Sequence, residues 1–339
     1  MATARMYPDF LGIGAQKAGT TWLYHNLRAH PEIWMPPRKE IHYFDGMGEE
    51  KPNPVFGVLG RRPEDRHWRG QMSGWLRKYA VDQPSAENLL WGLKYLSGTR
   101  DDDWYASLFQ SGRGRLVGEI TPSYSVLGEE TVAHIHGLMP EARIIFMMRN
   151  PIERVWSQTV MSFDRSKKGS AGTAKPTKLL RRTRRNTSRR LTNYLRTLEK
   201  WSTLYPKDRI FVGFLEDVQL FPVQFLSRMY EFLGVDASFV PQGLEKKVHS
   251  RSVGRIPTEV AARLARNYRS EIQSLDERFG GYASFWAYCA ERLIQDPAPN
   301  YADLDYPFTE TIFWDDWVRR EEAPNTIQSG PLSYLRSGS

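Results

Sequence analysis

The segment Phe10–Trp22 constrains the fold of this chain more than any other stretch. It begins with a short apolar run, passes through a turn that contains Gly14 and Gly19, and enters a helix at Thr20. A turn of this kind leaves backbone N–H groups unpaired at the start of the helix, where they can bind an anion. Lys17 adds a positive charge to the same turn. The segment therefore predicts a strand, a turn and a helix that together bind a phosphate or a similar anion, with a purely structural turn as the alternative.

The spacing of this turn resembles the P-loop of nucleotide-binding enzymes, with one departure. A P-loop places a lysine and then a serine or threonine directly after its second glycine. Here Gly19 is followed by Thr20 and Thr21, and the lysine lies inside the loop at position 17.

A second segment predicts another anion site. Ala142–Met148 is an apolar run of strand length that ends in Arg149, and Pro151 suits the first turn of a helix that carries Ser157. A nucleotide hydrolase needs an acidic residue at the end of such a strand to hold magnesium. An arginine there instead favours a second phosphate site, with charge-assisted hydrogen bonds from Arg149 and Ser157. A surface arginine before an ordinary helix is the alternative.

The overall pattern predicts an α/β fold. Strands are expected at Phe10–Gly14, Leu116–Glu119, Arg143–Met148 and Ile210–Phe214, and helices near Thr20–Ala29, Glu129–Met139, Ile152–Phe163, Asn193–Leu204, Pro222–Leu233 and Pro257–Phe279. Strands that alternate with amphipathic helices indicate a central parallel sheet with helices on both faces and ligands at the carboxyl ends of its strands. No linker divides the chain convincingly, so we expect a single domain over residues 1–339.

Together these motifs resemble the sulfotransferases that use 3′-phosphoadenosine 5′-phosphosulfate (PAPS). The matching segments are Gln16–Trp22 for the 5′-phosphosulfate loop, Arg149–Ser157 for the 3′-phosphate element, and Lys39–Asp45, Trp104–Tyr105 and Gly118–Tyr124 for the heparan sulfate 3-O-sulfotransferase and N-sulfotransferase branch. The resemblance covers about residues 10–280. It implies a P-loop-like sheet and a sulfuryl transfer that releases adenosine 3′,5′-bisphosphate (PAP) without a metal.

The resemblance also implies which residues hold the nucleotide. They are Gln16, Lys17, Ala18, Gly19, Thr20, Thr21, Trp22, Arg149 and Ser157, and from a later loop Ser252, Gly254 and Arg255. Lys17 is expected at the bridging oxygen of the leaving group. Trp22 suits helix packing as well as ligand contact. In the later loop Val253 replaces a lysine of the glycan-modifying relatives, which weakens that match.

The segment Lys39–Asp45 supplies the expected base. Extended alternation would place Glu40 and His42 on one side of the segment, as a base and its partner require. His42 could orient Glu40, stabilise the transferring group or itself accept the proton. The resemblance assigns Lys39, Asp45 and Tyr124 to acceptor binding. A surface pair of Lys39 and Glu40 beside a core histidine is the alternative.

The charge of the chain is concentrated in one segment. Residues 165–190 contain eleven Lys or Arg and no acidic residue, whereas the whole chain carries +8. We expect a mobile basic insertion whose second half, Leu179–Leu198, continues as a helix. It is either a solvated loop or a docking surface for an anionic glycan, lipid head group or membrane surface. Nucleic acid fits less well because aromatic residues do not interleave the charges.

Further features bear on location and packing. No apolar run approaches the roughly 18 residues that cross a bilayer, and the first strand begins too early for a secretory signal. Golgi members of the resembled family carry a membrane anchor, so we expect a cytoplasmic, bacterial protein or an excised catalytic domain. Cys289, the single cysteine, is expected to be a packed core thiol. The aromatic tail, residues 300–339, is expected to pack on the domain or to line the acceptor pocket.

The expected reaction is transfer of the sulfuryl group from PAPS to a hydroxyl, less readily an amine, of a carbohydrate, glycolipid or small metabolite. Two other functions fit parts of the sequence: a P-loop kinase, and a non-catalytic protein that binds nucleotides or polyanions. The pattern encodes neither the acceptor nor the oligomeric state.

Overall fold

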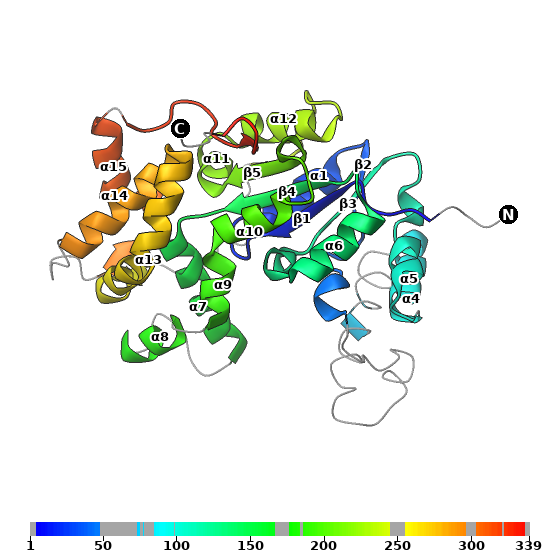
Figure 1. The fold of residues 1–339 in the computed structure, drawn as a ribbon, viewed down its shortest axis with the longest axis horizontal. Coiled ribbons are helices and arrows are strands. Elements are labelled where there is room, and N and C mark those ends of the chain that lie inside the picture. The colour runs from blue at the N-terminus through cyan, green and yellow to red at the C-terminus, as the bar shows by residue number, and fades with distance from the viewer. Residues whose placement is uncertain are drawn as a thin grey trace.

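A six-stranded sheet forms the centre of the described chain (Figure 1). The computed structural model describes residues 5–47, 73, 74, 77, 85–97, 99–166, 176–183, 186–244, 255–295, 303–320 and 322–335. The strand order is β2-β3-β1-β4-β5-β8. The bounds are Phe10–Gly14 for β1, Ile33–Trp34 for β2, Leu116–Ile120 for β3, Arg143–Met148 for β4, Ile210–Phe214 for β5 and Gly330–Pro331 for β8. All neighbouring strands are parallel except β8, which runs antiparallel to β5.

Helices flank this sheet on both sides. Their bounds are Thr20–Ala29 (α1), Ala86–Ser97 (α4), Asp102–Ser107 (α5), Glu129–Leu138 (α6), Pro151–Ser166 (α7), Pro176–Thr183 (α8), Asn186–Thr192 (α9), Tyr194–Ser202 (α10), Leu215–Leu220 (α11), Pro222–Leu233 (α12), Thr258–Phe279 (α13), Tyr282–Gln295 (α14) and Ile312–Arg319 (α15). In Figure 1, α12 lies on one side of the sheet and α6 on the other, α13 to α15 gather at one end, and α4 and α5 lie at the opposite end.

The predicted fold class is confirmed, and all four predicted strands are present. Every residue of β1 and of β5 is buried, as is typical of parallel strands that are covered on both faces. The sequence reading missed β2 and β8, which have only two residues each. It also missed a small antiparallel sheet of β6, Arg255–Pro257, and β7, Asp303–Asp305.

The basic insertion is divided into short helices, so the single helix predicted for Leu179–Leu198 is wrong. The chain forms α8, α9 and α10 instead. Asn193 separates the last two, because its side chain caps α10 by accepting a hydrogen bond from the backbone N–H of Arg196 at 3.2 Å. Residues 167–175 and 184–185, which hold part of the basic run, lie outside the described residues.

Cys289 is fully buried in α14, which confirms a packed core thiol. In the part of the chain that the structure describes, no helix has both the length and the apolar character needed to cross a membrane.

Candidate functional site

The loop after β1 has the geometry of an anion site. Its backbone is left-handed at Lys17, with φ of 73°, and at Gly19, with φ of 83°. Gly19 is the residue before α1 and brings no side chain to cap it, so the first-turn N–H groups of α1 are left for another partner. Thr20 is buried and Thr21 half-buried at the start of this helix. The loop is held against β4 by a 2.7 Å hydrogen bond from the Ala15 N–H to the Met147 carbonyl.

Arg149 joins this loop to the second predicted anion element. It follows β4, the neighbour of β1, and its Nη1 donates to the backbone carbonyl of Lys17 at 3.0 Å. Its Nε donates to Glu153 Oε2 at 3.2 Å, in the first turn of α7. Ser157 lies further along the same helix and is half-buried. The two segments that the sequence predicted as anion sites are therefore in direct contact.

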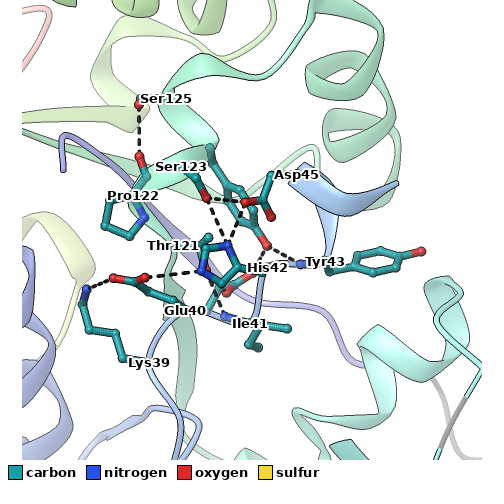
Figure 2. A network of polar contacts seen from close by, with 12 residues as sticks. Lys39, Glu40, Ile41, His42, Tyr43, Asp45, Thr121, Pro122, Ser123 and Ser125 are labelled. Atoms are coloured by element: carbon teal, nitrogen blue, oxygen red, sulfur yellow. Dashed lines mark hydrogen bonds and ion pairs between the residues drawn. The ribbon is translucent and has the colours of Figure 1, made fainter. Parts of the chain in front are cut away.

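The predicted catalytic segment forms a continuous polar chain at the carboxyl end of β3 (Figure 2). Lys39 Nζ contacts Glu40 Oε1 at 2.6 Å, and Glu40 Oε2 lies 3.4 Å from His42 Nε2. His42 Nδ1 lies 2.7 Å from Asp45 Oδ2. Ser123, which the sequence reading did not single out, donates to the same Asp45 oxygen at 2.6 Å. All four predicted members of this segment are thus linked.

The backbone that presents these side chains is left-handed rather than extended. Glu40 has a φ of 66° and His42 a φ of 58°, so the predicted strand-like alternation is wrong. The two side chains still face each other, and Ile41 and Tyr43 are buried beneath them. Left-handed conformations cost roughly 1–3 kcal/mol at such residues and persist only where the surroundings hold them.

A buried carboxylate supplies that support. The N–H of Ile41 donates to Thr121 Oγ1 at 3.1 Å, and the N–H of Tyr43 donates to the Tyr124 hydroxyl at 3.2 Å. Both hydroxyls donate in turn to Glu119, Thr121 to Oε2 at 2.8 Å and Tyr124 to Oε1 at 3.1 Å. Glu119 therefore fixes, through two side chains, the backbone on either side of His42.

Comparison with known proteins identifies the group to which this fold and site belong. Residues 8–239 match the Sulfotransferase family, which is more than half of the chain. The chain belongs to the sulfotransferase family.

Individual relatives of this sulfotransferase are distant. Mouse "Carbohydrate sulfotransferase 15" is 28% identical over 165 residues, which cover 45% of this chain and 27% of the mouse protein. "Membrane-associated sulfotransferase kil1" of Dictyostelium discoideum is 25% identical over 155 residues, which cover 44% of this chain and 22% of that protein. The chain therefore spans about a quarter of the length of these curated relatives. A sulfotransferase from Alicyclobacillus acidocaldarius shares the fold, with a TM-score of 0.53 and 22% identity over 80% of this chain and 94% of its own.

The neighbouring charges in the polar chain of this sulfotransferase lower the pKa of Glu40 and raise that of His42. Burial alone would raise the pKa of Glu40, but its hydrogen bond with His42 and the charge of Lys39 outweigh burial and lower that pKa to about 2. Hydrogen bonds to Asp45 and Glu40 raise the pKa of His42 to about 9. At neutral pH Glu40 is thus a carboxylate able to accept a proton, whereas His42 is already an imidazolium.

Some predicted contacts need correction. Tyr124, expected at the acceptor, is fully buried with its hydroxyl bonded to Glu119, so it supports the site from below. Trp22, 8% exposed, packs edge-on against Phe225 at a centroid distance of 5.9 Å, and its contact with a ligand stays a prediction. Ala18 is fully buried.

The later nucleotide loop is only partly described. Ser252 and Gly254 lie outside the described residues. Arg255 is exposed at the start of β6 and pairs with Asp305, Nε to Oδ1 at 3.1 Å. Gln16 is half-buried in the first loop.

The sequence reading missed Glu119 as a functional residue, although a signal was present. A carboxylate inside an apolar strand such as Leu116–Ile120 must find hydrogen-bond donors when it is buried. Tyr105 is a third donor, at 2.6 Å from Glu119 Oε1. Burial raises the pKa of Glu119 and the three donors oppose that shift.

Proposed function

We propose that this chain transfers the sulfuryl group of PAPS to a hydroxyl of a carbohydrate, glycolipid or small-metabolite acceptor. The observation that carries the proposal is the 3.0 Å contact between Arg149 and the Lys17 carbonyl. It joins two elements suited to phosphate groups at the carboxyl ends of adjacent strands β1 and β4. The polar chain of Glu40 and His42 lies beside the carboxyl end of the neighbouring strand β3, so the proposed base and anion sites share one end of the sheet.

The proposed nucleotide contacts follow the two elements. The first-turn N–H groups of α1, with the hydroxyls of Thr20 and Thr21, bind the 5′-phosphate. Arg149 and Ser157 bind the 3′-phosphate. Lys17 stabilises the negative charge that develops on the bridging oxygen as it leaves.

The proposed chemistry is an in-line displacement. The acceptor oxygen forms a bond to sulfur while the bond from sulfur to the bridging oxygen breaks, and PAP departs with that electron pair. The acceptor proton passes to a carboxylate oxygen of Glu40. His42 does not compete for it, because its raised pKa keeps it protonated. Its charge instead holds the Glu40 carboxylate in place and offsets negative charge on the transferring group.

We propose that the acceptor binds beside the polar chain. Lys39 and Asp45 border Glu40 and His42 and can bind hydroxyl groups by hydrogen bonds. The similarity to mouse carbohydrate sulfotransferase 15, over 27% of that protein, supports a carbohydrate acceptor. An amine is the less favoured acceptor. We also propose that the protein is cytoplasmic and bacterial. A kinase is disfavoured because an arginine occupies the strand end where a magnesium-binding acid is needed.

The described part of the basic insertion suits an anionic acceptor or surface. Lys178 and Arg181 of α8 are exposed. Lys178 Nζ lies 5.5 Å from the centroid of the Phe163 ring, and Arg182 Cζ lies 4.3 Å from the same centroid. We therefore include anion docking at α8 in the proposal, since exposed cations raise the local concentration of anionic ligands.

A transfer assay tests the proposed function directly. The protein is incubated with sulfur-labelled PAPS and a panel of sugar, glycolipid and phenolic hydroxyl acceptors, and labelled product and PAP are measured. Acceptor-dependent formation of PAP supports the proposal. Magnesium-dependent ATP turnover without PAPS turnover would instead indicate a kinase, and nucleotide binding with no turnover across the panel would indicate a binding protein.

A further inference from the structure

The C-terminal segment Asp303–Phe308 lies against the residues proposed to hold the 3′-phosphate, although it falls outside the part of the chain that matches the family. Its first half is strand β7, which pairs antiparallel with β6 so that Asp305 is opposite Arg255. The side chains of this pair contact each other at 3.1 Å. Arg255 is the last residue of the predicted later nucleotide loop. Strand β7 therefore contacts that loop through the strand pairing and through the ion pair of Asp305 with Arg255.

Tyr306 then continues from β7 to the second proposed phosphate element. Its ring centroid lies 4.8 Å from Cζ of Arg149. Burial raises the pKa of the Tyr306 phenol, while the charge of Arg149 and hydrogen bonds with Ser157 and Arg149 oppose that rise. One aromatic side chain of the tail therefore contacts both Arg149 and Ser157.

The position of Tyr306 is fixed on both sides. Leu304 before it is 4% exposed and Phe308 after it is 1% exposed. The backbone N–H of Phe308 donates to Glu153 Oε1 at 2.6 Å, and the other oxygen of Glu153 accepts from Arg149 Nε at 3.2 Å. The same carboxylate thus holds the tail and orients the arginine.

The contact with Tyr306 affects how strongly the Arg149 guanidinium can bind a phosphate. Its side chain is 9% exposed, with two nitrogens engaged by Glu153 and the Lys17 carbonyl. An aromatic ring beside a guanidinium attracts its charge and keeps water away from it. A less hydrated guanidinium makes stronger charge-assisted hydrogen bonds to an anion at its remaining edge.

We propose that Tyr306 is a specificity residue for the 3′-phosphate of the nucleotide, and that the segment Asp303–Phe308 forms one wall of that subsite. The inference rests on the proposed function, because it assigns the Arg149 element to PAPS. It concerns recognition of one phosphate group rather than the chemistry of transfer. A nucleotide that lacks the 3′-phosphate does not use this wall.

Calorimetry with two matched nucleotides tests the inference. PAP and AMP differ only by the 3′-phosphate, and each is titrated into the wild-type chain and into the Tyr306→Leu and Tyr306→Phe variants. Leucine keeps apolar bulk without an aromatic face, whereas phenylalanine keeps that face. We expect Tyr306→Leu to weaken PAP binding by roughly 3- to 30-fold with little change for AMP, and Tyr306→Phe to stay within about twofold of wild type.

Other outcomes would overturn the inference. Equal weakening of PAP and AMP would mean that Tyr306 only supports the fold, and tighter PAP binding in Tyr306→Leu would mean that the tail blocks the subsite. A wild-type chain that binds no PAP would defeat the proposed function as well, whereas PAP binding that is indifferent to Tyr306 defeats the inference alone. Hydrogen exchange of the wild-type chain needs no variant: PAP, but not AMP, should slow exchange in residues 303–308.

Discussion

Glu40 and His42 carry opposite charges at neutral pH, which supports the proposal that Glu40 is the proton acceptor. The low pKa of Glu40, about 2, keeps it ionised, so Glu40→Gln removes the base while it preserves size and some hydrogen bonding. We expect the kcat of sulfuryl transfer to fall by about 10²–10⁴, with PAP affinity unchanged. Glu130→Gln, at an exposed carboxylate of α6, is the control. Retention of most activity in Glu40→Gln would remove Glu40 from this role.

The raised pKa of His42 predicts a pH-dependent contribution to stability. A group whose pKa is raised by folding stabilises the fold fully below its unfolded value, here 6.5, and loses that contribution as the pH rises through about 9. The difference in melting temperature between wild type and His42→Gln should therefore be largest near pH 6 and shrink towards pH 9.5. His136→Gln, at a histidine outside the polar chain, serves as the control. A difference that stays constant over this range would contradict the assigned charge.

At the scale of elements, the strand end of β3 positions the catalytic segment. Thr121→Val deprives the Ile41 N–H of its acceptor and buried Glu119 of a donor, each a loss of about 1–3 kcal/mol if it is left unsatisfied. We expect a less stable protein with a lower kcat and normal PAP affinity, measured by denaturant unfolding, kinetics and calorimetry. Thr121→Ser keeps the hydroxyl and should restore both stability and kcat. An equal kcat in the valine and serine variants would mean that this support does not reach Glu40.

Gly19, before α1, is expected to affect PAP binding, whereas Gly128, before α6, is not. Gly19 has a φ of 83°, which costs an L-residue about 1–2 kcal/mol, and an added Cβ would lie 2.8 Å from Leu215 Cδ1. Gly128, before α6, has an ordinary φ of −69° and nothing within 4 Å of an added Cβ. Gly19→Ala should therefore weaken PAP binding by about tenfold, whereas Gly128→Ala should not. Equal affinities in the two variants would count against a nucleotide at this loop.

The same elements show what the sequence could reveal. The strands β1, β4 and β5 were predictable because each is a short apolar run that is buried on both faces and bounded by turn or helix signals. The anion loop was predictable because glycines followed by threonines are a recognisable sequence pattern at a strand-to-helix turn. The left-handed backbone at Glu40 and His42 was not, because hydroxyls about 80 residues away hold it.

At the scale of the whole molecule, contacts distant in sequence complete the site. The wall formed by Asp303–Phe308 depends on a strand pair between residues 255–257 and 303–305, and two-stranded pairing of three residues has no recognisable pattern. The break between α9 and α10 likewise depends on one capping asparagine, Asn193. The strand ends that carry the site were therefore predictable from the sequence. The contacts between distant residues that hold the site in place are visible only in the folded chain.

A crystal structure with bound PAP tests the central claim most directly. We predict one PAP molecule, with its 5′-phosphate at the N–H groups of Gly19–Thr21 and its 3′-phosphate at Arg149 and Ser157. The Lys17 side chain should extend towards the 5′-phosphate, on the side of that phosphate that faces Glu40. A nucleotide bound elsewhere, or bound with its 3′-phosphate out of contact with Arg149, would contradict the account.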